Sequence, residues 1–320
     1  MDQIVRPFDT ITVFGGATLD RVVRSAAAPV MGASNPGTVR RIPGGVGFNV
    51  AMVLARLGLT TRLVTAVGAD ADGESILAAA AAAGIDVDRV VVSETSGTAA
   101  YHATLDDGGN LIIGIADMMV CDEITPAAVA PSTRGSGQDF WVVDANLPAA
   151  TLAFLSAEAK DARVPIAALT VSPAKAIRLT PILDSLTYLF TNRREAAALL
   201  GRDPEEPGVA VSALAQELAG TRPAKVVVTN GNEPLAVSSR GEVRSHAPLR
   251  AAVKSVNGAG DSFAAGTIHG LAAGHALNDA IRFGRAAAVL TLEAGGIADA
   301  PFSEDALAER LATGPARIAS

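Results

Sequence analysis

The chain has 320 residues, of which 49% are hydrophobic and 18% are charged, a composition typical of a soluble globular protein with a substantial buried core. Its formal net charge of −7 argues against a nucleic-acid partner, because that kind of binding needs clustered lysine and arginine side chains. The only cysteine, Cys121, cannot form an internal disulfide, and with four histidines it offers no recognisable zinc site.

The start of the chain, residues 1–7, lacks the apolar core of a signal peptide. The longest apolar stretches are rich in alanine and are interrupted well before membrane-spanning length. We therefore expect a cytoplasmic protein with no membrane partner. No linker rich in Pro, Gly and Ser divides the sequence, so we expect a single domain over residues 1–320.

Apolar strands and amphipathic or alanine-rich helices alternate along most of the chain. The pattern predicts strands over 11–14, 62–67, 140–143, 165–169, 188–190 and 225–229, and helices over 46–57, 74–83, 149–160, 193–200, 208–219 and 263–271. Such alternation is typical of an α/β fold with a mostly parallel sheet and helices on both faces. Ligands of such sheets bind at the carboxyl ends of the strands.

Two segments, near 21–42 and 89–116, interrupt this alternation. Both consist of short apolar runs, and the second contains the turn Asp107-Gly108-Gly109-Asn110. They are therefore predicted to form short strands joined by turns.

Residues 255–262 read Ser-Val-Asn-Gly-Ala-Gly-Asp-Ser and directly precede the last of these predicted helices. The N–H groups of Gly258, Ala259 and Gly260 would lie at a helix N-terminus, where they can bind a phosphate. The carboxylate of Asp261 could then accept a proton from a hydroxyl that attacks this phosphate. Alternatively, the segment is an ordinary loop in which Asp261 stabilises the positive end of the helix dipole.

Further motifs accompany this glycine turn. They are a glycine turn before the first helix (Gly44, Gly45 and Asn49), a pair of polar residues after one strand (Asn192 and Glu195), and the end of another strand (Thr229, Asn230 and Gly231). In this order, the motifs resemble the ribokinase-like (PfkB-type) carbohydrate and nucleoside kinases over nearly the whole chain. The resemblance implies a three-layer α/β/α sandwich with a mostly parallel sheet. It also implies that segments 21–42 and 89–116 form a small β-lid over the substrate, with a homodimer through the lid.

The resemblance implies ATP as the phosphate donor, with Mg²⁺. Asp261 would be the general base, and Asn192 and Glu195 would organise the metal and the phosphates, Glu195 through water. Thr229, Gly231 and Asn257 would belong to the nucleotide site. Alternatively, Asn192 and Glu195 simply mark the start of a helix, in which Asn192 is the N-cap and Glu195 is the third residue.

Ser255 replaces the acidic residue that many sugar kinases of this family associate with a monovalent-cation site. Activation by potassium is therefore not assumed.

On the acceptor side, Asp20 follows the first strand, and its carboxylate can accept two hydrogen bonds from a vicinal diol. Gly44 and Gly45 would offer backbone contacts, and Asn49 resembles the sugar-binding asparagine of the family. Asp20 could instead be a solvated turn residue, and Asn49 a buried polar cap.

Several short segments resemble the pseudouridine kinase branch of the family. They are Ser34-Asn35-Pro36-Gly37, Ile115-Ala116-Asp117-Met118, Asp144-Ala145-Asn146-Leu147, Val171-Ser172-Pro173-Ala174-Lys175 and Ser255-Val256-Asn257. This branch implies transfer of phosphate from ATP to the ribose 5′-hydroxyl of pseudouridine. The alternatives are a kinase for another nucleoside or a free sugar, of the ribose, fructose or adenosine class, and an inactive nucleoside sensor, against which the intact Asp261 argues.

The base of pseudouridine carries one N–H donor that uridine lacks, so a selective pocket should present an extra acceptor. Asn35 and Asp117 are the candidates on the lid, and Lys175 is a candidate for substrate contact. Residues 34–37 could equally be a β-turn, Asp117 a cap or a solvated residue, and Lys175 a solvated lysine. Phe48 stands where pseudouridine kinases commonly have arginine, so any contact of that arginine is missing here.

Overall fold

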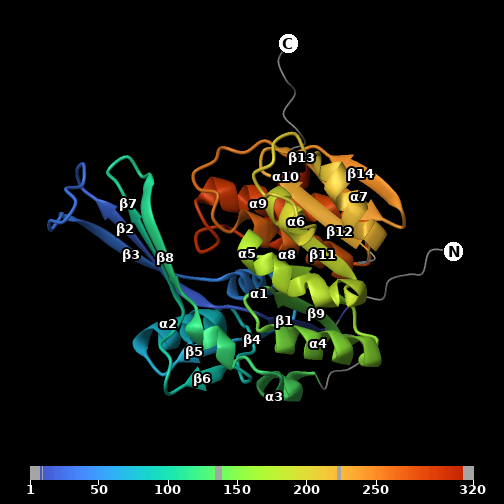
Figure 1. The fold of residues 1–320 in the computed structure, drawn as a ribbon, viewed down its shortest axis with the longest axis horizontal. Coiled ribbons are helices and arrows are strands. Elements are labelled where there is room, and N and C mark those ends of the chain that lie inside the picture. The colour runs from blue at the N-terminus through green and yellow to red at the C-terminus, as the bar shows by residue number, and fades with distance from the viewer. Residues whose placement is uncertain (1–7, 9, 134–138, 222–224, 313–320) are drawn as a thin grey trace, which may run out of the picture.

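The computed structural model describes residues 8, 10–133, 139–221 and 225–312 (Figure 1). Within these residues, the main sheet has eight strands in the order β14-β13-β12-β11-β10-β9-β1-β4. Their bounds are β1 (Thr10–Phe14), β4 (Thr61–Val64), β9 (Asp139–Asp144), β10 (Ile166–Leu169), β11 (Tyr188–Asn192), β12 (Lys225–Asn230), β13 (Glu233–Ser239) and β14 (Glu242–His246). The strands from β4 to β12 pair in parallel, and β13 and β14 add an antiparallel edge.

Both faces of this sheet are buried, because alternate residues of each strand pack into two separate apolar clusters. In β9, Phe140 and Val142 belong to one cluster, whereas Trp141 and Val143 belong to the other. The first cluster includes α1 (Val46–Arg56), α2 (Ala71–Ala82), α8 (Ala259–Ala272), α9 (Leu277–Ala294) and α10 (Glu304–Ala312). The second includes α3 (Pro126–Val129), α4 (Ala149–Ala162), α5 (Pro173–Ala176), α6 (Arg193–Leu199) and α7 (Val211–Thr221). The predicted three-layer α/β/α architecture is confirmed.

A second sheet projects from this body as a long tongue, at the left of Figure 1. Its strand order is β3-β2-β7-β8, and the strands are β2 (Thr18–Ser25), β3 (Gly37–Gly44), β7 (Ala100–Leu105) and β8 (Leu111–Asp117). We call this sheet the lid. Because β2 begins only four residues after β1 ends, the base of the lid lies directly at the carboxyl end of the main sheet.

The lid is smaller than the predicted segment 89–116 implies. Residues of β6 (Val91–Ser93) pair with β5 (Ala66–Gly68) in a separate two-stranded sheet, so the prediction that 89–99 belong to the lid is wrong. The single strand predicted over 62–67 is likewise divided between β4 and β5. Apolar alternation reports that a segment is a strand, but not which sheet it joins.

Two helices begin at residues other than the predicted ones. The helix predicted from residue 74 begins at Ala71, because Asp70 accepts a hydrogen bond from the backbone N–H of Gly73 at 2.8 Å. The helix predicted over 208–219 occupies Val211–Thr221.

The base of the lid is tied to α2 by charged side chains. Asp72 accepts hydrogen bonds from Arg21 of β2 and Arg41 of β3. Arg21 also lies 3.1 Å from Nε2 of His102 on β7. Two lid strands, β2 and β3, are thus held directly against α2.

No helix in the described part of the chain is both long and apolar enough to cross a membrane. Residues 1–7, on which the cytoplasmic expectation rests, lie outside the described residues.

Candidate active site

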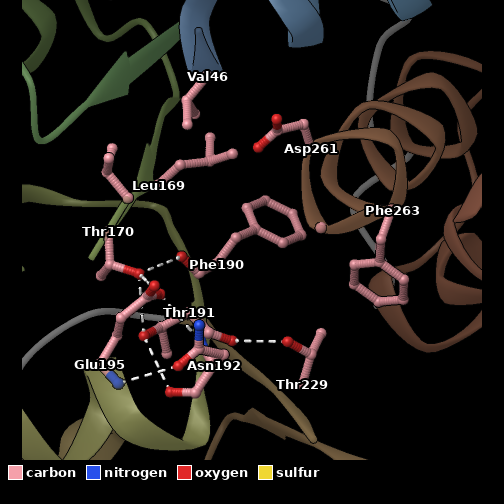
Figure 2. A pocket seen from close by; sticks show the side chains of 12 residues that line it. Val46, Leu169, Thr170, Phe190, Thr191, Asn192, Glu195, Thr229, Asp261 and Phe263 are labelled. Atoms are coloured by element: carbon pink, nitrogen blue, oxygen red, sulfur yellow. Dashed lines mark hydrogen bonds between the residues drawn. The ribbon is translucent and has the colours of Figure 1, made fainter. Parts of the chain in front are cut away.

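A pocket lies at the carboxyl ends of β10, β11 and β12, the position expected for a ligand of a parallel sheet (Figure 2). Figure 2 shows Asp261 projecting from α8 on one side, Asn192 and Glu195 at the start of α6 on another, and Val46 from α1. The polar lining residues include Thr170, Thr191, Asn192, Glu195, Thr229 and Asp261. Five predicted site residues, counting Gly260, therefore line one pocket.

The glycine turn before α8 bends at Gly258 and is open at Gly260. Gly258 is the N-cap of α8 with φ of 76°, and a Cβ at this position would lie 2.7 Å from Cδ1 of Ile297. Around a Cβ on Gly260 there would be no atom within 4 Å, so that side of the turn is open. The first N–H groups of a helix have no intrahelical acceptor, although that of Ala259 makes a long bond of 3.3 Å to the carbonyl of Val256. The open amides follow at Gly260 and Asp261.

The Asp261 carboxylate is held from the opposite side of the site. Nδ2 of Asn49, on α1, donates a hydrogen bond of 2.7 Å to Oδ2 of Asp261. Burial raises the pKa of Asp261 to about 7, with further increases from the nearby carboxylates of Asp144, Glu195 and Asp20, while the Asn49 bond opposes the shift. A carboxylate with this pKa can accept a proton near neutral pH and is then easily regenerated.

Asp20 lies beside the second predicted glycine turn. It accepts a hydrogen bond of 2.7 Å from Oγ1 of Thr18, and burial raises its pKa, an effect that the Thr18 bond opposes. A Cβ on Gly44 would lie 2.9 Å from Oδ2 of Asp20, so only glycine leaves this carboxylate its position. Gly45 has φ of 91°, and a Cβ there would lie 2.6 Å from the carbonyl oxygen of Gly16. A side chain at position 44 would thus displace the Asp20 carboxylate, and one at position 45 would collide with the backbone of Gly16.

Asn192 and Glu195 form a complete capping box. Oδ1 of Asn192 accepts from the N–H of Glu195 at 3.0 Å, and Oε2 of Glu195 accepts from the N–H of Asn192 at 3.3 Å. The helix-start alternative is thus correct as a description of local structure. Both residues nevertheless line the pocket, and Glu195 is only 8% exposed. Capping does not exclude a role toward a ligand.

Thr229 and Gly231 occupy the end of β12. Oγ1 of Thr229 donates to the carbonyl of Thr191 at 3.3 Å, and Thr229 lines the pocket (Figure 2). Gly231 follows in a turn with φ of 60°. The strand end is therefore positioned beside the pocket as expected.

The other eleven predicted residues do not line this pocket, and three of them have exposed side chains. The Asn35 side chain is exposed in the loop between β2 and β3, where it bonds to the backbone of Val30 at 2.8 and 3.0 Å. Asp117 is exposed at the end of β8 and accepts from the N–H of Met119 at 3.3 Å. Asn257 is exposed, and its N–H donates to Oγ of Ser255 at 3.2 Å. The turn and cap alternatives for Asn35 and Asp117 are present in the structure.

The structure adds two residues at the carboxyl end of β9 to the site, Asp144, which ends the strand, and Asn146, which follows it. Asp144 is 1% exposed and accepts from the N–H of Gly16 at 2.9 Å, and burial raises its pKa. A Cβ on Gly15 would lie 2.4 Å from its Oδ2. Lys175 donates from Nζ to Oδ1 of Asn146 at 2.5 Å. The sequence signal for Asp144 is a carboxylate at the end of an apolar run, although segment 144–147 was predicted only to mark the resemblance to the pseudouridine kinase branch.

The pfkB family carbohydrate kinase model matches residues 9–304, so the chain belongs to this family. Its members carry sugar or nucleoside kinase activity, and the fold described above is ribokinase-like. The pseudouridine kinase of Escherichia coli (strain K12) is 30% identical over 292 residues, which cover 90% of this chain and 92% of the relative. The ribokinase of Bacillus subtilis (strain 168) is 31% identical over 286 residues, covering 88% and 92%.

Two solved structures illustrate the likeness in fold. A carbohydrate kinase from Agrobacterium tumefaciens is 34% identical with a TM-score of 0.84, covering 96% of this chain and 98% of that chain. The ribokinase of Arabidopsis thaliana complexed with ribose and ATP is 23% identical with a TM-score of 0.81, covering 96% and 99%.

Proposed function

We propose that the protein transfers the γ-phosphate of ATP to the ribose 5′-hydroxyl of pseudouridine. The observation that carries the kinase chemistry is Asp261, a carboxylate with a pKa near 7 that lies beside an open glycine turn and is held by Asn49. The branch segments and the 30% identity to a pseudouridine kinase favour this acceptor. The 31% identity to a ribokinase keeps ribose as the second candidate.

The donor side is assigned from the residues around the pocket. The open amides at Gly260 and Asp261, together with that of Gly258, would stabilise charge on the transferring phosphoryl group. The predicted amide of Ala259 is instead bonded to the carbonyl of Val256. Asn192, Thr229, Gly231 and Asn257 would contact the nucleotide. Two solved ribokinases, from Arabidopsis thaliana and Cryptococcus neoformans, carry ATP and ADP in their complexes, which supports ATP as the donor.

Glu195 is the acidic side chain that fits a metal bound mainly by phosphates. The bonds from Thr170 and Asn192 both reach its Oε2, so Oε1 is the oxygen assigned to a water ligand of the metal. Among the residues that the structure describes, no group of three or more His, Cys, Asp or Glu side chains is arranged to hold an ion alone, which suits indirect binding. When bound, Mg²⁺ would neutralise charge on the phosphates.

The acceptor side is assigned to Asp20, Asn49 and the glycine turn at 44–45. Asp20 and Asn49 would bind ribose hydroxyls, and Asp261 would take the proton of the 5′-hydroxyl as its oxygen attacks the phosphate. Lys175, held by Asn146, would close the other side of the acceptor site. Asn35 and Asp117 would reach the base only when the lid closes over it.

A substrate panel tests this proposal. With ATP and Mg²⁺, we expect kcat/KM for pseudouridine to exceed that for uridine, adenosine, ribose and fructose. Loss of one hydrogen bond to a buried partner is worth roughly 1–3 kcal/mol, so the preference over uridine should be about 5- to 150-fold. The measurement is ADP release under one coupled assay.

Matched variants distinguish contacts to the base from contacts to the ribose. Asp117→Ala and Asn35→Ala should reduce the ratio of pseudouridine to uridine, whereas Asp20→Ala should weaken both substrates alike, because they share the same ribose. If the enzyme turned over ribose faster than pseudouridine, the proposed acceptor would be the free sugar and not the nucleoside. The proposed kinase activity would remain.

We also propose a homodimer through the lid. The outer strand β8 is exposed along its whole length, and Leu111, Ile113 and Ile115 are 57%, 52% and 58% exposed. An edge strand with exposed apolar residues is a ready surface for pairing with a second copy.

Analytical ultracentrifugation tests the dimer. We expect the wild-type protein to sediment as a dimer and the double variant Ile113→Lys, Ile115→Lys as a folded monomer, because two charges would be buried at the edge. A monomeric wild-type protein at micromolar concentration would contradict the proposal.

A further inference from the structure

Val171 has a backbone conformation that valine rarely adopts. It lies two residues after the end of β10 and has φ of 67°, in the left-handed region where a β-branched side chain is strained. The N–H of Ser172 donates to the carbonyl of Thr170 at 2.8 Å, so the three residues form a γ-turn of the strained, positive-φ type. Strain of this kind persists where the surrounding structure enforces it, and it clusters at functional sites.

The sequence around Val171 explains why the strain falls on this residue. Ser172 has φ of −161° and ψ of 160°, the extended conformation that a residue before proline favours, and Pro173 follows it. Ser172 therefore cannot share the bend, and the chain must reverse at Val171 alone. Val171 also packs against the apolar cluster that covers one face of the sheet, and it lines the pocket. Packing holds the turn in one conformation.

Of the described residues, only Arg163 and Arg240 share a positive φ with Val171 among those that are not glycine. Arg163 ends α4, and Arg240 forms the turn between β13 and β14. Neither arginine lines the pocket, and positive φ is common at helix ends and hairpin turns. Val171 is the residue of the three that has this conformation beside the pocket.

The first residue of the turn, Thr170, supports the donor side of the site. Thr170 is 1% exposed, and its Oγ1 is within hydrogen-bonding distance of Oε2 of Glu195 and 3.1 Å from Oγ1 of Thr191. Figure 2 shows Thr170 directed toward the Glu195 carboxylate. Thr170 and the backbone N–H of Asn192 thus together hold Oε2 of Glu195.

The residues after the turn support the acceptor side. The carbonyl of Ser172 accepts from the N–H groups of Lys175 and Ala176 at 3.1 and 2.8 Å, which starts α5 and places Lys175. Lys175 then bonds to Asn146, whose own N–H donates to Oδ1 of Asp144 at 2.8 Å. One turn therefore joins the two halves of the site.

We propose that Val171 is a positioning residue that fixes the spacing between Glu195 on the donor side and Lys175 with Asn146 on the acceptor side. This inference rests on the proposed phosphoryl transfer, in which the acceptor oxygen and the phosphate must meet in line. Glycine would adopt the same φ without strain but would also sample other conformations. A looser turn should leave each ligand bound and reduce the fraction of complexes in reactive alignment.

The test compares V171G with R240G, which relieves the same kind of strain away from the pocket. We expect V171G to keep its Tm within about 4 °C of wild type, because lost packing and relieved strain offset each other. Its KM values for ATP and acceptor should stay within about 3-fold, while kcat falls about 10-fold. R240G should keep the wild-type kcat. This split between kcat and KM would not follow from simple destabilisation.

A second pair of variants tests the contact between Thr170 and Glu195 on the donor side. These variants test the inference if V171G does not fold. T170V removes the hydroxyl beside Glu195 and should lower kcat about 10-fold, whereas T170S restores the hydroxyl and should recover kcat to within about 2-fold of wild type. A folded V171G as active as R240G, or a T170S as impaired as T170V, would overturn the inference alone. A wild-type protein without turnover on any acceptor would overturn the proposed function and this inference together.

Discussion

Replacement of Asp261 by asparagine should lower kcat by about 10²-fold or more and leave the KM values for ATP and acceptor nearly unchanged. Asparagine has almost the same volume as aspartate, and after rotation of its amide it can still accept the hydrogen bond from Asn49. It cannot accept a proton from the attacking hydroxyl. The measurement is steady-state ADP release at saturating pseudouridine and ATP, near pH 8, where Asp261 is ionised.

Protein stability provides the first control for this variant. The pKa of Asp261 is about 7 in the folded protein against an ordinary value of 3.8, so the folded state binds a proton more tightly than the unfolded state between these values. The contribution of this group to stability therefore falls as pH rises from about 4 to 7, and the full penalty is present above pH 7. Asparagine removes the buried charge, so D261N should have a Tm at pH 8 equal to or above that of wild type.

Asp279 provides the second control, because it is also an acidic residue in the first turn of a helix, α9, and is exposed. D279N should keep the wild-type kcat. If D261N and D279N were equally active, Asp261 would only stabilise the helix dipole, which is the alternative that the sequence left open.

The architecture was largely readable from the sequence, because parallel strands buried on both faces are continuous apolar runs and the helices between them are periodic. What could not be read is the partner of each strand. Residues 62–67 look like one strand, yet the chain leaves the main sheet after Val64, and Ala66–Gly68 pair with β6. That choice depends on segments distant in sequence, which local pattern does not report.

The candidate site divides in the same way. The glycine turn at Gly258 is a local signal, and in the structure Gly258 directly precedes α8 as its N-cap, with φ of 76°. The bond between Asn49 and Asp261 spans 212 residues, and that between Gly16 and Asp144 spans 128. The left-handed conformation of Val171 could not be predicted, because β-branched residues argue against such a turn. Sequence thus identifies candidate groups, whereas their mutual contacts and the strain between them come only from the folded chain.

The dependence of kcat/KM on pH should report the ionisation of Asp261 directly. If only the ionised carboxylate accepts the proton, kcat/KM for the acceptor should fall as the pH is lowered. The midpoint should lie near pH 7, the pKa that burial produces. Between pH 7 and pH 5 the ionised fraction drops from about one half to about one hundredth, so the rate constant should fall about 50-fold. An ordinary exposed aspartate would leave it almost unchanged over this range.

Substitution of Asn49 distinguishes Asp261 from other titrating groups. The Asn49 hydrogen bond favours the ionised carboxylate and so lowers the pKa of Asp261 against the effect of burial. In N49A this bond is lost, so the midpoint of the profile should move to higher pH, and activity at pH 7 should fall more than activity at pH 9. The acceptor KM should rise separately, because Asn49 is also assigned to the ribose. A midpoint that stays in place or moves to lower pH in N49A would show that a group other than Asp261 controls the profile.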